Sequence, residues 1–115
     1  MVKMNPETKQ IMSDILKYKG KNFVVLCAVE EMSELTKELM KDINRHKDNG
    51  GDIFEELADV CIQLEYMKLI YNVSDDKIWT YLNERIPSKW APRIEKWKAR
   101  VAETGNPDAN KRILD

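Results

Sequence analysis

The chain has 115 residues, which is the size of a single folded domain. Hydrophobic residues make up 43% and charged residues 34% of the chain, and this balance excludes a disordered protein. Four Gly and four Pro are too few turn residues for an all-β fold with many hairpins. The net charge of −1 gives no general attraction to nucleic acid polymers or membranes. We therefore expect one cytoplasmic, all-α domain over residues 1–115, without a signal peptide or membrane span.

Three helices are predicted in the first part of the chain. Asn5, Pro6 and Glu7 are typical of a helix start, because Asn caps the helix, Pro suits its first position and an acid favours its positive end. Asp52 is a second good N-cap, and it follows a loop that is rich in glycine and charge. The apolar spacing then predicts helices at about 5–20, 21–45 and 52–71, with the loop at 47–51.

Two more helices are predicted in the last third of the chain. Ser74 is followed by acids and starts a helix in the same way as Asn5 does. Pro87 and Pro92 remove backbone donors, so this helix is expected to break or kink between them. A fifth helix is predicted over about 92–103, and residues 104–115 are expected to form a non-helical tail. The pattern as a whole predicts a four- to five-helix bundle.

Several acids interrupt the apolar stripes instead of forming a separate polar face. With about 100° per residue, Glu34 and Glu38 lie within about 60° of Glu31. On the next helix Asp59 lies about 60° from Glu56, and Gln63 falls between them. Unpaired carboxylates in a packed seam are unfavourable and need cations or a metal.

The chemical type of these side chains favours a hard metal ion. Lys37 and Lys41 project from other faces of their helix, so local ion pairs with the acids are expected to be poor. Carboxylate oxygens favour Mg²⁺ or Mn²⁺, whereas the one His and two Cys of the sequence do not have the spacing of zinc ligands. The alternative is that the acids lie on a solvated, charged helix face.

The acids fall in two motifs that resemble those of the MazG-like superfamily of all-α nucleoside triphosphate pyrophosphohydrolases. The family patterns are EExxEL and EELADV, and the matching residues are Glu30-Glu31-Met32-Ser33-Glu34-Leu35 and Glu55-Glu56-Leu57-Ala58-Asp59-Val60. A weaker third block begins at Arg93 and looks like the family's KxxRxxxRL. Here Arg93 replaces the usual Lys and Lys96 the usual Arg, which keeps the charge but changes the geometry. The resemblance covers about residues 20–103.

This resemblance implies Mg²⁺-dependent hydrolysis of a nucleoside triphosphate, with the deoxy form preferred, to a monophosphate and pyrophosphate. It assigns the metal ligands as Glu31, Glu34, Glu56 and Asp59, with Mn²⁺ as an alternative ion. Glu30 or Glu38 is expected to accept the proton of the attacking water or to hold a further ion. The family forms dimers or tetramers, so we expect a homodimer or homotetramer with a shared site.

The substrate is expected to meet basic and aromatic residues. Residues 84–101 carry six bases against two acids, whereas residues 30–59 carry ten acids against four bases. Arg93, Lys96 and Arg100 are therefore predicted to hold the triphosphate or pyrophosphate. The candidates for recognising the base are Tyr66, Trp79, Tyr81, Asn83, Trp90 and Trp97, and the nucleobase itself stays open. Two alternatives are a phosphoribosyl-ATP pyrophosphohydrolase and a non-catalytic helical interaction module of the same fold.

Overall fold

The computed structural model of the chain describes residues 4–45 and 48–107, and these residues form four helices and no strand. The predicted all-α class is therefore confirmed. The helices of the described residues are too short or too polar to cross a membrane. The chain divides into two compact units at residues 73 and 74. The first contains α1 (Pro6–Lys19), α2 (Lys21–Arg45) and α3 (Gly50–Ile70), and the second contains α4 (Asp75–Thr104).

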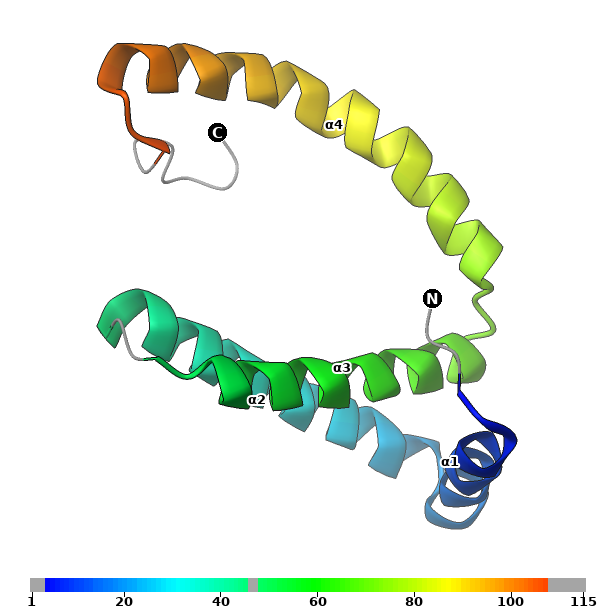
Figure 1. Cartoon of the computed structure of the whole chain (residues 1–115). Helices are drawn as coiled ribbons and strands as arrows, with labels where there is room; N and C mark the ends of the chain where they lie inside the picture. The colour runs from blue at the N-terminus through cyan, green and yellow to red at the C-terminus, as the bar shows by residue number, and fades with distance from the viewer. Residues whose placement is uncertain (1–3, 46–47, 108–115) are drawn as a thin grey trace. The chain divides into compact units, whose positions relative to one another are not determined.

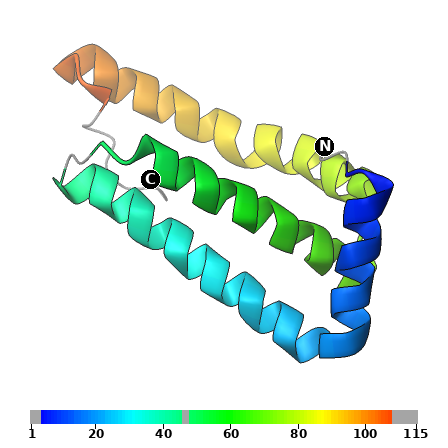
Figure 2. The same cartoon turned by 60° about the horizontal axis from the view of Figure 1, so that its bottom comes forward.

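The first unit is built on an antiparallel pair of helices, α2 and α3 (Figure 1). Helix α1 lies across one end of this pair, beside the start of α2 and the end of α3 (Figure 2). It begins as predicted, because the side chain of Asn5 accepts a hydrogen bond of 2.8 Å from the main-chain N–H of Thr8. It ends at Gly20, whose φ of 85° lies in a region that glycine adopts without strain.

Helix α3 starts earlier than predicted. Its N-cap is Asn49 and its first residue is Gly50, so the expectation that Asp52 caps the helix is wrong. Asp52 instead lies in the first turn, where its negative charge interacts favourably with the helix dipole. The side chain of Asn49 makes no capping hydrogen bond and is directed to α2 instead, where Nδ2 donates to two oxygens of Glu38.

Helix α4 is continuous through Pro87 and Pro92, so the predicted division into two helices is wrong. The helix bends along its length instead of breaking (Figure 1). The hydroxyl of Ser88 donates to the main-chain oxygens of Glu84 and Arg85, a contact that accompanies helix bending. The helix ends at Gly105, which has a left-handed φ of 69°. The predicted tail from residue 104 lies largely outside the described residues.

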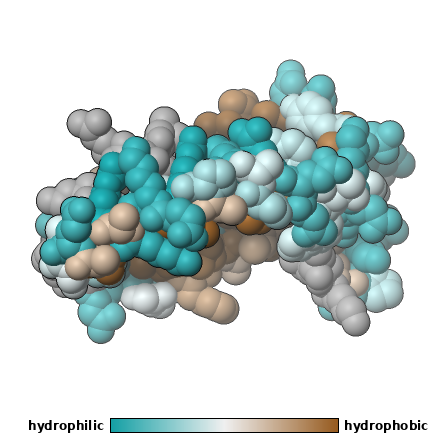
Figure 3. Space-filling model, turned by 90° about the horizontal axis from the view of Figure 1, so that it is seen from above, coloured by the Kyte–Doolittle hydropathy of each residue, from teal (hydrophilic) through white to brown (hydrophobic). Residues whose placement is uncertain are grey.

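The core is small. The buried apolar residues of the described chain are Val24, Ala28 and Tyr66, all in the first unit. Much larger side chains stay exposed there, including Leu26 at 67% and Phe54 at 71%. Apolar residues therefore appear at the surface among the hydrophilic ones (Figure 3).

Candidate functional site

Acids from α2 and α3 meet across the seam between the two helices. Glu31 on α2 and Glu56 and Asp59 on α3 each offer a carboxylate oxygen, and these three oxygens lie within 4.8 Å of one another. We call these residues the acidic triad. The antiparallel pairing of α2 and α3 explains the contact, because it places the acidic stretch of one helix beside that of the other. Three of the four predicted metal ligands are therefore brought together.

Glu56 is the most perturbed member of the triad. Burial raises the pKa of its carboxyl above the ordinary value, and the negative charges of Glu31, Asp59 and Glu34 raise this pKa further. Its Oε2 atom is buried and accepts no hydrogen bond from any residue that the structure describes. Both observations mean that the charged form of Glu56 lacks a positive partner, which a proton or a metal ion would supply.

Gln63 on the same helix presents a second buried oxygen without a donor. Its Oε1 atom is buried from solvent and accepts no hydrogen bond from the described parts of the chain. Gln63 follows Glu56 by seven residues, so the two side chains leave the same side of α3. The sequence places Gln63 beside the acids, but no functional role was predicted for it. Its position in the helical repeat is the signal that marks it.

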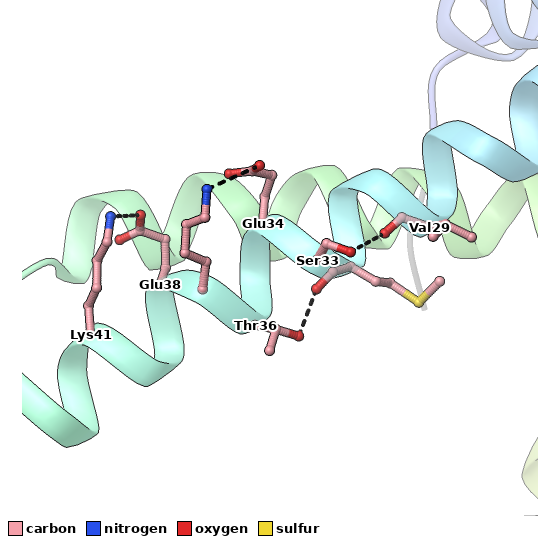
Figure 4. A network of polar contacts seen from close by, with 8 residues as sticks. Val29, Ser33, Glu34, Thr36, Glu38 and Lys41 are labelled. Carbon is pink, nitrogen blue, oxygen red and sulfur yellow. Dashed lines mark hydrogen bonds and ion pairs between the residues drawn. The ribbon is translucent and has the colours of Figure 1, made fainter.

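Glu34, the fourth predicted ligand, lies at the edge of this site. Its charge contributes to the raised pKa of Glu56, so the two carboxylates lie near each other. Glu34 also forms an exposed ion pair of 3.7 Å with Nζ of Lys37 (Figure 4). The expectation that local ion pairs with these acids would be poor is wrong for Glu38, whose Oε1 lies 2.9 Å from Nζ of Lys41. A lysine three residues after a glutamate reaches back along the helix surface through its flexible stem.

Glu38 is held away from the triad by its own contacts. It is only 9% exposed, and its Oε1 accepts a bond of 2.9 Å from Nζ of Lys41 (Figure 4). Its Oε2 accepts a bond of 2.8 Å from Nδ2 of Asn49. These contacts join α2 to the start of α3, and they favour a structural role over the predicted catalytic one. Glu30, the other predicted proton acceptor, is exposed on α2 and is not a member of the triad.

The predicted substrate contacts belong to two different environments. Tyr66 is buried at the end of α3, where burial raises the pKa of its hydroxyl. It lines a cavity of about 410 Å³ between α1 and α3, together with Met4, Lys9, Met12, Ser13, Leu16, Glu65 and Leu69. It therefore contributes to the packing of α1. The other predicted contacts all lie on α4. Four of them are exposed, namely Trp79, Tyr81, Asn83 and Lys96, and four are half-buried, namely Trp90, Arg93, Trp97 and Arg100.

Comparison with known proteins identified no relative of the chain. No protein-family model, no curated protein sequence and no solved structure matches the chain. The resemblance of its two acidic motifs to the MazG-like superfamily therefore stays a prediction from sequence.

Proposed function

We propose that the chain is a Mg²⁺-dependent nucleoside triphosphate pyrophosphohydrolase that acts on the cytoplasmic nucleotide pool as a house-cleaning enzyme. It would convert a nucleoside triphosphate, preferentially a deoxynucleotide, and water into a monophosphate and pyrophosphate. The observation that carries this proposal is the acidic triad with its buried, unpartnered Glu56 oxygen. A merely solvated acidic face would explain the exposed Asp59, but it would not explain that oxygen.

The residues of the triad fit a divalent cation. Three carboxylate oxygens within 4.8 Å repel one another, and the raised pKa of Glu56 is the result of that repulsion and of burial. Hard cations such as Mg²⁺ and Mn²⁺ prefer oxygen ligands of this type. Glu34 would complete the predicted set by leaving Lys37, which is a small loss because exposed ion pairs contribute little.

The chain's own residues have separate tasks in the proposed reaction. Glu31, Glu56 and Asp59 would hold Mg²⁺, and Glu34 would join them. When bound, the ion supplies charge neutralisation for the phosphates and activation of a water molecule at the α-phosphorus. Arg93, Lys96 and Arg100 offer donors for the phosphate oxygens. Glu30 is the better remaining proton acceptor, since both oxygens of Glu38 already accept hydrogen bonds.

The exposed apolar side chains of the first unit support a homodimer or homotetramer. Leu26 and Ile43 on α2 and Phe54 on α3 are each more than 60% exposed. A helix pair with so few buried side chains gains stability by covering this surface, and a second copy of the chain offers the matching one. An oligomer would also allow residues of two subunits to contribute to one site.

A substrate panel tests the proposed function directly. The four deoxynucleoside triphosphates, the ribonucleotides and phosphoribosyl-ATP are each incubated with the protein and Mg²⁺, and pyrophosphate release is measured. Turnover of a nucleoside triphosphate supports the proposal, and exclusive turnover of phosphoribosyl-ATP supports the histidine-pathway alternative. Absence of turnover, together with no effect of Mg²⁺ on thermal stability, would identify a non-catalytic module, because a bound ion must stabilise the folded state.

A further inference from the structure

Helix α4 carries basic side chains and indoles on one side. With about 100° per residue, six side chains of its second half fall within an arc of about 120°. We call them the cation–aromatic stripe, and they are Lys89, Trp90, Arg93, Lys96, Trp97 and Arg100. The two indoles form one edge of the arc and the lysines form the other. The stripe therefore offers aromatic surface and positive charge side by side.

The indoles and the neighbouring cations are in contact. The ring centroids of Trp90 and Trp97 are 5.9 Å apart, with the planes inclined by 47°. The guanidinium carbon of Arg93 lies 5.1 Å from the centroid of Trp90, and Nζ of Lys89 lies 4.9 Å from it. Contacts of this type hold the side chains in fixed positions relative to one another. The stripe is thus an organised surface of α4 itself.

Arg93 keeps hydrogen-bonding capacity within this cluster. Its Nη1 atom is buried and meets no acceptor in residues 4–45 and 48–107. A guanidinium that is packed against an indole is fixed in orientation, and its unused donors suit phosphate oxygens or the acceptor atoms of a base. A ligand that supplies those acceptors would remove the unfavourable burial of Nη1.

The chemistry of the stripe selects a ligand that is both aromatic and anionic. Inorganic phosphate or an acidic peptide would pair with the lysine and arginine side chains but would make no use of the indoles. A nucleotide satisfies both, because every base has a face that stacks on an aromatic side chain and its phosphates attract lysine and arginine. Trp79 lies on the same helix at 47% exposure, but no ring contact or cation contact is found for it among the described residues.

We propose that the cation–aromatic stripe is the nucleotide-recognition surface of the chain, with the base stacked on Trp90 and Trp97. Arg93 would bridge the base and phosphates, and Lys89 and Lys96 would face the phosphates. The proposal rests on the proposed function in taking a nucleoside triphosphate as the ligand. It goes beyond that function by assigning the base to these two indoles instead of to Tyr66 or Asn83.

Binding to a variant without turnover tests this assignment. The full chain carrying Glu56→Gln is titrated in Mg²⁺ with each of the four deoxynucleoside triphosphates and, separately, with inorganic tripolyphosphate, by calorimetry. Adding Trp90→Leu should weaken binding of the preferred nucleotide about 10- to 100-fold and leave tripolyphosphate binding unchanged. Trp90→Phe should restore most of the affinity. Tyr18→Leu is the control, since it removes an exposed aromatic side chain of α1 that belongs to no predicted site, and it should change neither affinity.

Each other outcome has a defined meaning, once circular dichroism shows that helix content is kept. Unchanged nucleotide affinity in the Trp90→Leu protein would overturn the stripe, even if the enzyme hydrolyses nucleotides. An equal loss of tripolyphosphate binding would also overturn it, because Trp90 would then only position Arg93. If a single-stranded oligonucleotide binds more tightly than the mononucleotide, and its binding depends steeply on salt, the ligand of the stripe would be a nucleic acid and not a mononucleotide. Trp90-dependent nucleotide binding, with no hydrolysis by the chain that keeps Glu56, would support the stripe and contradict the proposed enzymatic activity.

Discussion

Asn49 connects the start of α3 to α2, and its removal is expected to destabilise the first unit. Asn49 is 4% exposed, and its Nδ2 donates to the main-chain oxygen of Glu38 at 2.9 Å and to Oε2 of Glu38 at 2.8 Å. Asn49→Ala removes both hydrogen bonds and supplies no replacement donor. The Glu38 carboxylate would keep its contact with Lys41.

The size of the effect follows from the two lost bonds. A hydrogen bond to a charged group contributes about 1.5–3 kcal/mol, and one to a neutral carbonyl about 0.5–1.5 kcal/mol. Loss of a helix cap adds nothing, because the Asn49 side chain makes no capping bond. Its Oδ1 is buried without a donor among the described residues, so deleting that atom offsets about 1 kcal/mol or more of the loss. The net decrease in the free energy of unfolding should be about 1–3 kcal/mol.

Urea unfolding followed by circular dichroism measures this change. Both proteins are compared at one fixed concentration, since association would shift the apparent stability. Asn22→Ala is the control, because Asn22 is exposed on α2 and its replacement should change the free energy of unfolding by no more than about 0.5 kcal/mol. A loss for Asn49→Ala as small as that of the control would refute the role of Asn49 as a buried connection.

The remaining predictions concern the triad and the assembly. Glu56→Gln should abolish turnover and raise the thermal stability of the metal-free protein at pH 7. This gain should shrink on acidification. The raised pKa of Glu56 means that, between the ordinary carboxyl pKa and the raised one, the folded state binds more protons than the unfolded state, so the stability of the unchanged protein falls as pH rises through this range. A gain that does not vary with pH would contradict the burial of Glu56 and its repulsion by the neighbouring acids. Hydrolysis in ¹⁸O-labelled water should place the label in the monophosphate and not in pyrophosphate. Mg²⁺ or Mn²⁺ should support the hydrolysis, and Ca²⁺ should support it poorly. Orthophosphate and a diphosphate as the first products would exclude attack at the α-phosphorus. Sedimentation at micromolar concentration should show a dimer or tetramer, and a well-folded monomer of 13.5 kDa would count against a shared site.

Sequence reasoning reached the features that depend on local spacing. The cap at Asn5 follows from the chemistry of a few adjacent residues, and the structure has it. The approach of Glu31 to Glu56 and Asp59 follows from helical periodicity, once two acidic stripes are placed on neighbouring helices. In these places the local pattern and the packed structure agree, so the pattern is a sufficient guide.

Features that depend on contacts between distant residues were missed. The partner of Asn49 is eleven residues away, so its role could not be read from the loop in which it lies. The pairs of Lys37 and Lys41 were missed because helical angles treat side chains as rigid, whereas a lysine side chain bends along the surface. Pro87 was given too much weight, because the loss of one donor can bend a helix without ending it.

The two prolines also affect how α4 exchanges and moves. Each proline leaves the carbonyl four residues earlier without its usual helical donor. Pro87 affects the carbonyl of Asn83, and Pro92 affects that of Ser88. The middle of α4 therefore has fewer backbone hydrogen bonds to break than either flank. Amide hydrogens there should exchange faster than those of a regular helix interior, so that protection is lowest near the centre of the helix as well as at its ends. Lys89 and Trp90 lie between the two prolines, so the stripe overlaps this weak point, and a change in the bend of α4 would also change the direction of these side chains.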